Sequence, residues 1–138
     1  MERAEKNKMT KYEVLKKYFG YDSFREGQEM LVDALLNGQD VLGIMPTGAG
    51  KSLCYQIPAL LLPGITLVVS PLISLMKDQV ENLVSKGISR AVTINGLLSP
   101  IERSRALEAV ISGEATLCTS PLSHCVPAPF LPHCSNAA

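Results

Sequence analysis

The spacing of apolar residues along the chain predicts helices separated by short strands. Helical segments carry apolar residues three and four positions apart, whereas the strand segments are short apolar runs bounded by polar residues. Capping boxes open two of the helices, from Thr10 to Glu13 and from Ser99 to Glu102. The predicted helices cover about 11–19, 26–36, 51–61, 70–86 and 100–112. The predicted strands are 41–45, 65–69, 91–94 and a last one that begins at 115.

This order of elements indicates an α/β fold with a mainly parallel sheet flanked by helices, because strands alternate with helices. The runs 41–45 and 65–69 are expected to be buried strands, since they are almost entirely apolar. The helix that begins at Ser70 and Pro71 is expected to turn one apolar stripe toward the core. That stripe consists of Leu72, Leu75, Met76, Val80, Leu83 and Val84.

Composition narrows the class of protein further. The 138 residues suffice for one domain, and 46% hydrophobic with 19% charged residues is ordinary for a globular one. Thirteen basic and thirteen acidic side chains cancel, so any surface for nucleic acid must be local. No apolar run reaches the roughly 18 residues of a membrane helix. The charged N-terminus leads into no secretory signal, so we expect a cytoplasmic, nucleoid-associated protein without membrane partners.

The sequence PTGAGKS at residues 46–52 predicts a phosphate-binding loop, because it follows a predicted strand and opens a predicted helix. Gly48 and Gly50 allow backbone N–H groups to turn inward around phosphate oxygens. Lys51 is expected to reach the β- and γ-phosphates as the catalytic lysine, and the Ser52 hydroxyl to bind Mg²⁺. The alternative is a glycine-rich turn followed by an incidental Lys-Ser. The loop residues predicted to bind nucleotide are Thr47, Gly48, Ala49, Gly50, Lys51 and Ser52.

Three separated segments resemble motifs of the RecQ family of DNA helicases. Residues 45–60 resemble motif I, residues 19–28 resemble motif 0, and residues 70–80 resemble motif Ia, in the family's order and spacing. Met45 stands where the general loop pattern has glycine, a departure that many helicases share. The resemblance spans about residues 10–117. It implies an incomplete RecA-like P-loop NTPase lobe that uses ATP and Mg²⁺.

The resemblance also implies roles for side chains outside the loop. In motif 0, Gln28 would hydrogen-bond the edge of adenine, with Tyr21 and Arg25 stacked on its faces. In motif Ia, the residues implied to face the phosphate backbone of single-stranded DNA are Ser70, Ser74 and Lys77. The pattern alone leaves two alternatives open, in which Tyr21 is a core residue and Lys77 is an ordinary solvent-exposed lysine.

By lineage the resemblance implies an ATP-dependent DNA helicase that unwinds duplexes 3′ to 5′ in recombination and repair. The chain has no Asp-Glu pair, so the family's motif II, which would hold Mg²⁺ and activate water, is absent. We therefore expect a fragment that binds ATP and, weakly, single-stranded DNA without unwinding alone. The missing strands would leave a sheet edge and apolar faces uncovered. A non-enzymatic nucleotide-binding module and a DEAD-box-like RNA helicase fragment stay open, as does the oligomeric state.

The last residues differ in composition from the rest. Every charged side chain lies in residues 1–114, and residues 115–138 have none. We divide the chain into a partial helicase ATP-binding domain, 1–117, and an out-of-frame or disordered tail, 118–138. For one choice of codons, a one-base deletion converts L-L-Y-V-A-P-E, which resembles the family's usual text at this point, into LCTSPLS of 117–123. The tail's first residues could still pair as a strand. Its cysteines and histidines lack zinc-site spacing.

Overall fold

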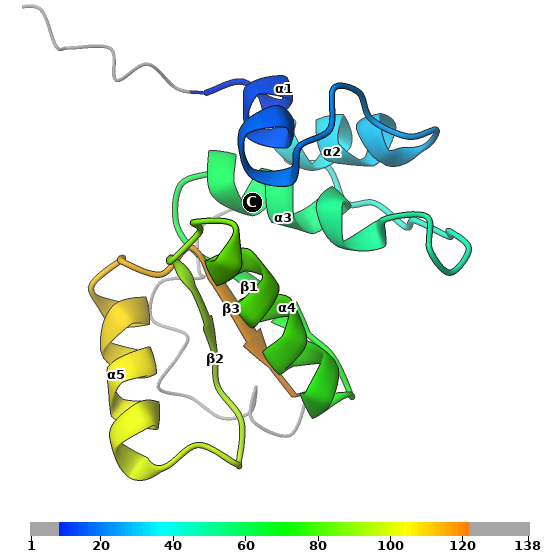
Figure 1. The fold of residues 1–138 in the computed structure, drawn as a ribbon. Coiled ribbons are helices and arrows are strands. Elements are labelled where there is room, and N and C mark those ends of the chain that lie inside the picture. The colour runs from blue at the N-terminus through cyan, green and yellow to red at the C-terminus, as the bar shows by residue number, and fades with distance from the viewer. Residues whose placement is uncertain (1–8, 122–138) are drawn as a thin grey trace, which may run out of the picture.

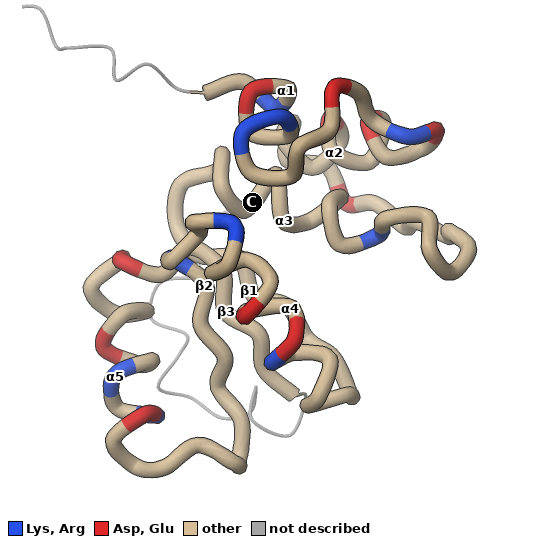
Figure 2. Tube along the Cα trace, in the orientation of Figure 1, with Lys and Arg blue, Asp and Glu red and all other residues tan. Residues whose placement is uncertain are grey.

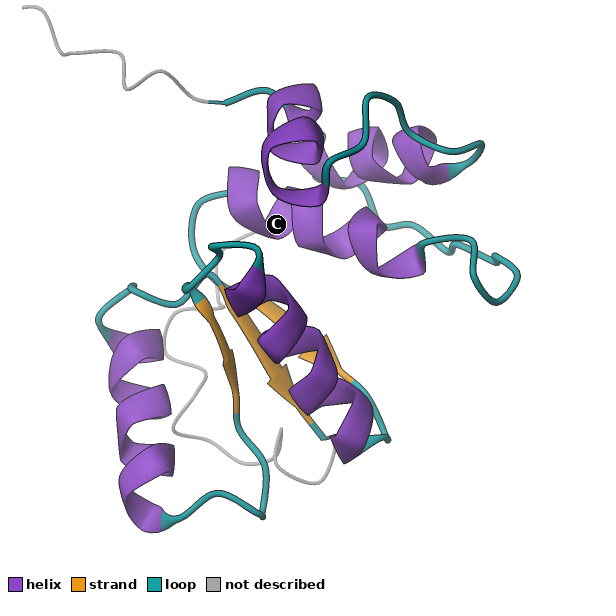
Figure 3. Cartoon of the chain, viewed as in Figure 1, coloured by secondary structure: helices purple, strands orange, loops and turns teal. Residues whose placement is uncertain are grey.

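The computed structural model describes residues 9–121 and contains five α-helices and three strands in that range (Figures 1 and 3). The helices are α1 (Lys11–Val14), which continues as the π-helical turn η1 (Leu15–Phe19), α2 (Gln28–Leu36), α3 (Lys51–Leu61), α4 (Ile73–Ser85) and α5 (Pro100–Ile111). The strands are β1 (Thr66–Val69), β2 (Ala91–Thr93) and β3 (Leu117–Ser120).

The three strands form one parallel sheet in the order β1-β3-β2, which confirms the predicted α/β class. Leu117 at the start of β3 lies opposite Thr66 of β1 on one side and Ala91 of β2 on the other. The connection from β1 to β2 contains α4, and the connection from β2 to β3 contains α5. None of the strands carries a charged side chain, and the charges lie on the helices and loops around them (Figure 2).

Two apolar clusters hold the helices and the sheet together, and α3 contributes to both. The first packs α1, η1, α2 and α3 around Val14, Leu15, Val32 and Ile57. The second joins α3 and α4 to the sheet through Ala59, Leu83, Ile88, Ala91 and Leu117. Figure 1 shows the same division, with α1, α2 and α3 grouped at one end of the molecule and the sheet at the other. The helix after the predicted loop therefore connects the two parts.

The helix starts follow their local sequence signals closely. Both predicted capping boxes are present, with Thr10 and Ser99 accepting the backbone N–H of the third helical residue. The helix predicted from Ser70 begins only at Ile73, because the Ser70 hydroxyl accepts the N–H of Leu72 and keeps that residue extended. Of the predicted inner stripe of α4, Met76 and Leu83 are the fully buried members. Leu72, Leu75 and Val84 are exposed.

The prediction of a buried strand at 41–45 is wrong. The segment has no regular secondary structure and pairs with no described strand, and Leu42 and Ile44 are 86% and 89% exposed (Figure 3). The prediction that 65–69 is fully buried is also wrong, since Leu67 and Val69 of β1 point outward and are about half exposed. An apolar run becomes a buried strand only where a neighbour and a covering layer exist. Among the described residues, β1 pairs only with β3, so its other edge is open as expected.

The described residues cover only the start of the predicted tail. Cys118 is buried in β3, whose strand runs to Ser120, so the first tail residues do pair as a strand. Residues 122–138 lie outside the described range, and the division at 117/118 stays a prediction. No helix within residues 9–121 is long and apolar enough to cross a membrane. No group of three or more potential metal-binding side chains occurs in that range either.

Candidate nucleotide-binding site

The predicted phosphate loop connects the exposed segment 41–45 to the first residue of α3. Gly48 and Gly50 have φ values of 82° and 77°, in the left-handed region that side chains other than glycine disfavour. Gly50 is also the N-cap of α3, and a Cβ there would collide with Nε2 of Gln28. The loop conformation thus depends on glycine at both positions.

Two side chains just before and at the start of α2, Arg25 and Gln28, hold the loop by its carbonyl groups. Nη1 of Arg25 donates to the carbonyl of Gly48 at 2.8 Å. Nε2 of Gln28 donates to the carbonyls of Ala49 and Gly50, both at 3.1 Å. The other end of the Gln28 amide accepts the N–H of Arg25 at 2.8 Å, and the side chain is almost wholly buried. The Gln28 amide is therefore fully engaged with backbone groups.

These contacts fix the direction of the loop's N–H groups. In a trans peptide the carbonyl and the following N–H point in opposite directions. Because Gln28 binds the carbonyls of Ala49 and Gly50, the N–H groups of Gly50 and Lys51 point away from it. They also lie at the N-terminus of α3, where the helix leaves N–H groups unpaired and favours negative charge. The arrangement is chemically suited to phosphate oxygens.

The structure brings Arg25 and Gln28 to the loop. Tyr21 is 48% exposed, so it is not a core residue. Gln28 holds the loop here, so adenine reading by Gln28 and base stacking by Tyr21 and Arg25 stay predictions. Sequence reasoning missed the loop-holding contacts. They join residues more than twenty positions apart, and no local pattern signals such pairs.

Lys51 and Ser52 are the first two residues of α3, with Lys51 exposed and Ser52 half-buried. One turn further, the hydroxyl of Tyr55 donates to Oε1 of Gln79 on α4 at 2.7 Å. Burial raises the pKa of this phenol above its usual value. The phenol hence stays protonated and able to donate at neutral pH.

A recess of about 510 Å³ lies between α4 and α5, beside the carboxyl end of β2. Ser74 and Lys77 line it from α4, and Thr93 and Asn95 line it from the end of β2. Open α/β sheets bind ligands at the carboxyl ends of their strands. The structure thus brings together two of the three residues predicted to contact DNA. Ser70 lies in the turn before α4 and does not line this recess.

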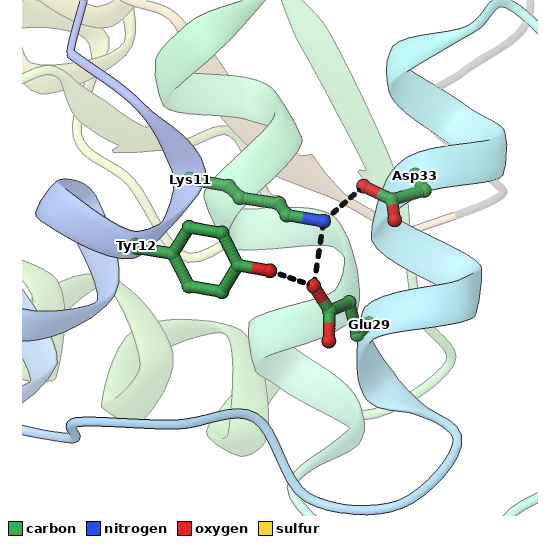
Figure 4. A network of polar contacts seen from close by, with 4 residues as sticks. All are labelled: Lys11, Tyr12, Glu29 and Asp33. Atoms are coloured by element: carbon green, nitrogen blue, oxygen red, sulfur yellow. Dashed lines mark hydrogen bonds and ion pairs between the residues drawn. The ribbon is translucent and has the colours of Figure 1, made fainter.

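A polar network ties α1 to α2 at the residue after Gln28 (Figure 4). Nζ of Lys11 lies 2.8 Å from Glu29 and 2.5 Å from Asp33, and Tyr12 donates its hydroxyl to the same Glu29 oxygen. Hydrogen bonds to Asp33, and then to Glu29, raise the pKa of Lys11 well above its usual value. Hydrogen bonds from Lys11 and Tyr12 lower the pKa of Glu29. The network positions the start of α2, and no sequence motif indicated it.

The stabilisation from this network is expected to disappear in acid. Because the pKa of Glu29 is lowered in the folded chain, its contribution is present above the usual value of 4.5 and is lost as pH falls through the lowered pKa. The raised pKa of Lys11 keeps that partner charged up to at least its usual 10.5. We expect the Tm difference between wild type and Lys11→Met to be constant from about pH 6 to 8 and to shrink toward about pH 3. Thermal scans by circular dichroism measure it.

Lys16→Met is the matched control, because the ion pair of Lys16 with Asp22 is 74% and 82% exposed at its two side chains. Such exposed pairs contribute little, so this variant should follow wild type at every pH. A Lys11→Met difference that stays constant down to about pH 3 would show that the carboxylates contribute no stability through Lys11.

Comparison with known proteins adds an independent observation. Residues 25–123 match the family model described as DEAD/DEAH box helicase. The chain is 54% identical over 110 residues to the ATP-dependent DNA helicase RecQ of Haemophilus influenzae, a match that covers 80% of this chain and 18% of that protein. It is 46% identical over 101 residues to the probable ATP-dependent DNA helicase RecS of Bacillus subtilis. That match covers 72% of this chain and 20% of that protein. The chain thus spans about a fifth of the length of these curated relatives.

Proposed function

Because the chain belongs to the DEAD/DEAH box helicase family, we propose that it is the nucleotide- and DNA-binding part of a RecQ-type ATP-dependent DNA helicase. The similarity to RecQ helicases confirms the resemblance inferred from motifs 0, I and Ia. These relatives are named as DNA helicases, which favours DNA over RNA as the nucleic acid. Because the chain spans about a fifth of them, the activity of the whole helicase is part of the proposal.

The loop geometry is the observation that carries the proposal. Arg25 and Gln28 occupy the loop's carbonyl groups, which leaves the N–H groups of Gly50 and Lys51 to face a triphosphate. Lys51 forms no ion pair within residues 9–121, so its ammonium group can bind the β- and γ-phosphates. The Ser52 hydroxyl would hold Mg²⁺, which neutralises phosphate charge when bound. Isothermal titration of the chain with MgATP tests this assignment.

We assign the recess between α4 and α5 to single-stranded DNA, whose phosphates would lie along Ser74 and Lys77. Within residues 9–121, Lys77 forms one ion pair, a loose contact of 3.7 Å to Glu81, and its side chain is 70% exposed. The ammonium group is hence free to exchange this partner for a phosphate. Ser70, which precedes α4, stays a predicted contact of the same strand.

Replacing Lys77 with alanine should weaken binding of a single-stranded oligothymidylate and reduce its salt dependence. Each phosphate neutralised on a single strand contributes about 0.7 to the slope of log affinity against log salt concentration. We expect the slope to fall by about that amount. Lys86→Ala, at the other end of α4, is the control and should leave affinity and slope unchanged. Equal slopes for wild type and Lys77→Ala would remove Lys77 from the DNA surface.

A further inference from the structure

Tyr55 and Gln79 form a direct polar contact between the helix after the loop and the helix that carries Lys77. The hydrogen bond from Tyr55 Oη to Gln79 Oε1 is 2.7 Å long and joins residues 24 positions apart. Tyr55 lies three residues after Ser52 on α3, which places the two side chains on the same face of that helix. Tyr55 therefore contacts α4 from the same face of α3 that carries Ser52, the residue expected to hold Mg²⁺.

The two faces of α4 carry different contacts. Lys77 and Gln79 are two positions apart, which places them on nearly opposite sides of an α-helix. Lys77 is exposed and lines the recess, whereas Gln79 is half-buried and meets Tyr55. Met76 and Leu83 anchor the helix in the core. A shift of α4 at Lys77 therefore reaches Gln79 as well.

The surroundings of the contact favour its use as a link. Tyr55 and Val80 pack against the apolar cluster that contains Ala59 and Leu83. In such partly desolvated surroundings a hydrogen bond is stronger than in water, and losing it costs more. The contact is thus sensitive to small relative movements of α3 and α4.

We propose that the Tyr55–Gln79 hydrogen bond couples the nucleotide loop to the DNA recess, with both residues acting as positioning residues. The inference rests on the proposed function. DNA bound along Ser74 and Lys77 fixes α4, which through Gln79 holds Tyr55 and the first turn of α3 in place. Nucleotide bound at Ser52 fixes α4 through the same contact. Because such coupling is reciprocal, each ligand tightens binding of the other by the same factor.

Isothermal titration of the full chain with MgATP, with and without saturating oligothymidylate, measures this factor. We expect DNA to raise ATP affinity about fivefold in wild type, the value of one hydrogen bond. Tyr55→Phe should bring the factor close to one while changing ATP affinity without DNA by less than about twofold. Tyr18→Phe removes a hydroxyl from another tyrosine packed on the same cluster and should keep the full factor.

Gln79→Met tests the contact from its other side, and its thermal melting verifies that it folds. It should lose the coupling as Tyr55→Phe does, and the double variant should lose no more than either single one. The inference would be overturned if DNA left the ATP affinity of wild type unchanged. It would also be overturned if DNA raised the ATP affinity of Tyr55→Phe or Gln79→Met as much as that of wild type. A wild-type chain that binds no MgATP or no oligothymidylate would overturn the proposed function instead.

Discussion

Alanine in place of Lys51 is expected to weaken MgATP binding by about 10- to 150-fold. The substitution removes one charge-assisted contact to the β- and γ-phosphates, worth about 1.5–3 kcal/mol, and each 1.4 kcal/mol corresponds to about tenfold in affinity. Isothermal titration of wild type and variant under identical salt conditions gives the ratio. Thermal stability should hardly change, because Lys51 is exposed and forms no ion pair within residues 9–121.

Lys17→Ala provides the control for a change in net charge, since Lys17 is an exposed lysine on η1. It should bind MgATP as wild type does. Equal affinities of wild type and Lys51→Ala would contradict the assignment of the loop as a phosphate site.

Alanine in place of Gln28 should destabilise the chain and loosen the loop at the same time. The substitution leaves the N–H of Arg25 and the carbonyls of Ala49 and Gly50 without their side-chain partner. A buried group left unpaired costs about 1–3 kcal/mol, and water can reach the carbonyls of this surface loop, so we expect a total loss of about 2–3 kcal/mol. Urea denaturation followed by circular dichroism measures the free energy of unfolding.

Nucleotide binding by the same variant separates two roles of Gln28. Loosening of the loop lowers the affinities for ATP and GTP by the same factor, whereas loss of adenine reading brings their ratio toward one. We expect the overall loss, since the amide holds the loop. The control is Gln39→Ala, an exposed glutamine just beyond α2. A Gln28→Ala chain as stable as wild type, with unchanged ATP affinity, would show that the three hydrogen bonds do not hold the loop.

Features that depend on neighbouring residues were predictable from the sequence. Both capping boxes form as expected because their hydrogen bonds join residues three positions apart. The helix at 51–61 has the predicted bounds, since glycine ends the loop just before it. The parallel sheet was predictable from the alternation of strand and helix segments, which can be read directly from the sequence.

Features that depend on distant residues were not predictable in this way. The segment 41–45 has the composition of a strand, yet strand formation also needs a neighbour, which no local pattern reveals. The contacts of Gln28 with the loop and of Tyr55 with Gln79 depend on how three helices pack. The resemblance to a family implied that Gln28 is a site residue, but only the packing shows that its amide reaches the loop's carbonyl groups.

The central position of β3 has a consequence for how the chain folds. β3 is the last of the described strands along the chain, and it is the only described strand with which either β1 or β2 pairs. The sheet therefore has high contact order, and such non-local pairings form slowly. During synthesis, α1, α2 and α3 can assemble as soon as they emerge, whereas β1 and β2 must wait until Leu117–Ser120 has left the ribosome. In that interval residues 46–50 and the side chains that hold them, Arg25 and Gln28, exist without a formed sheet, and the apolar strands are open to chaperones.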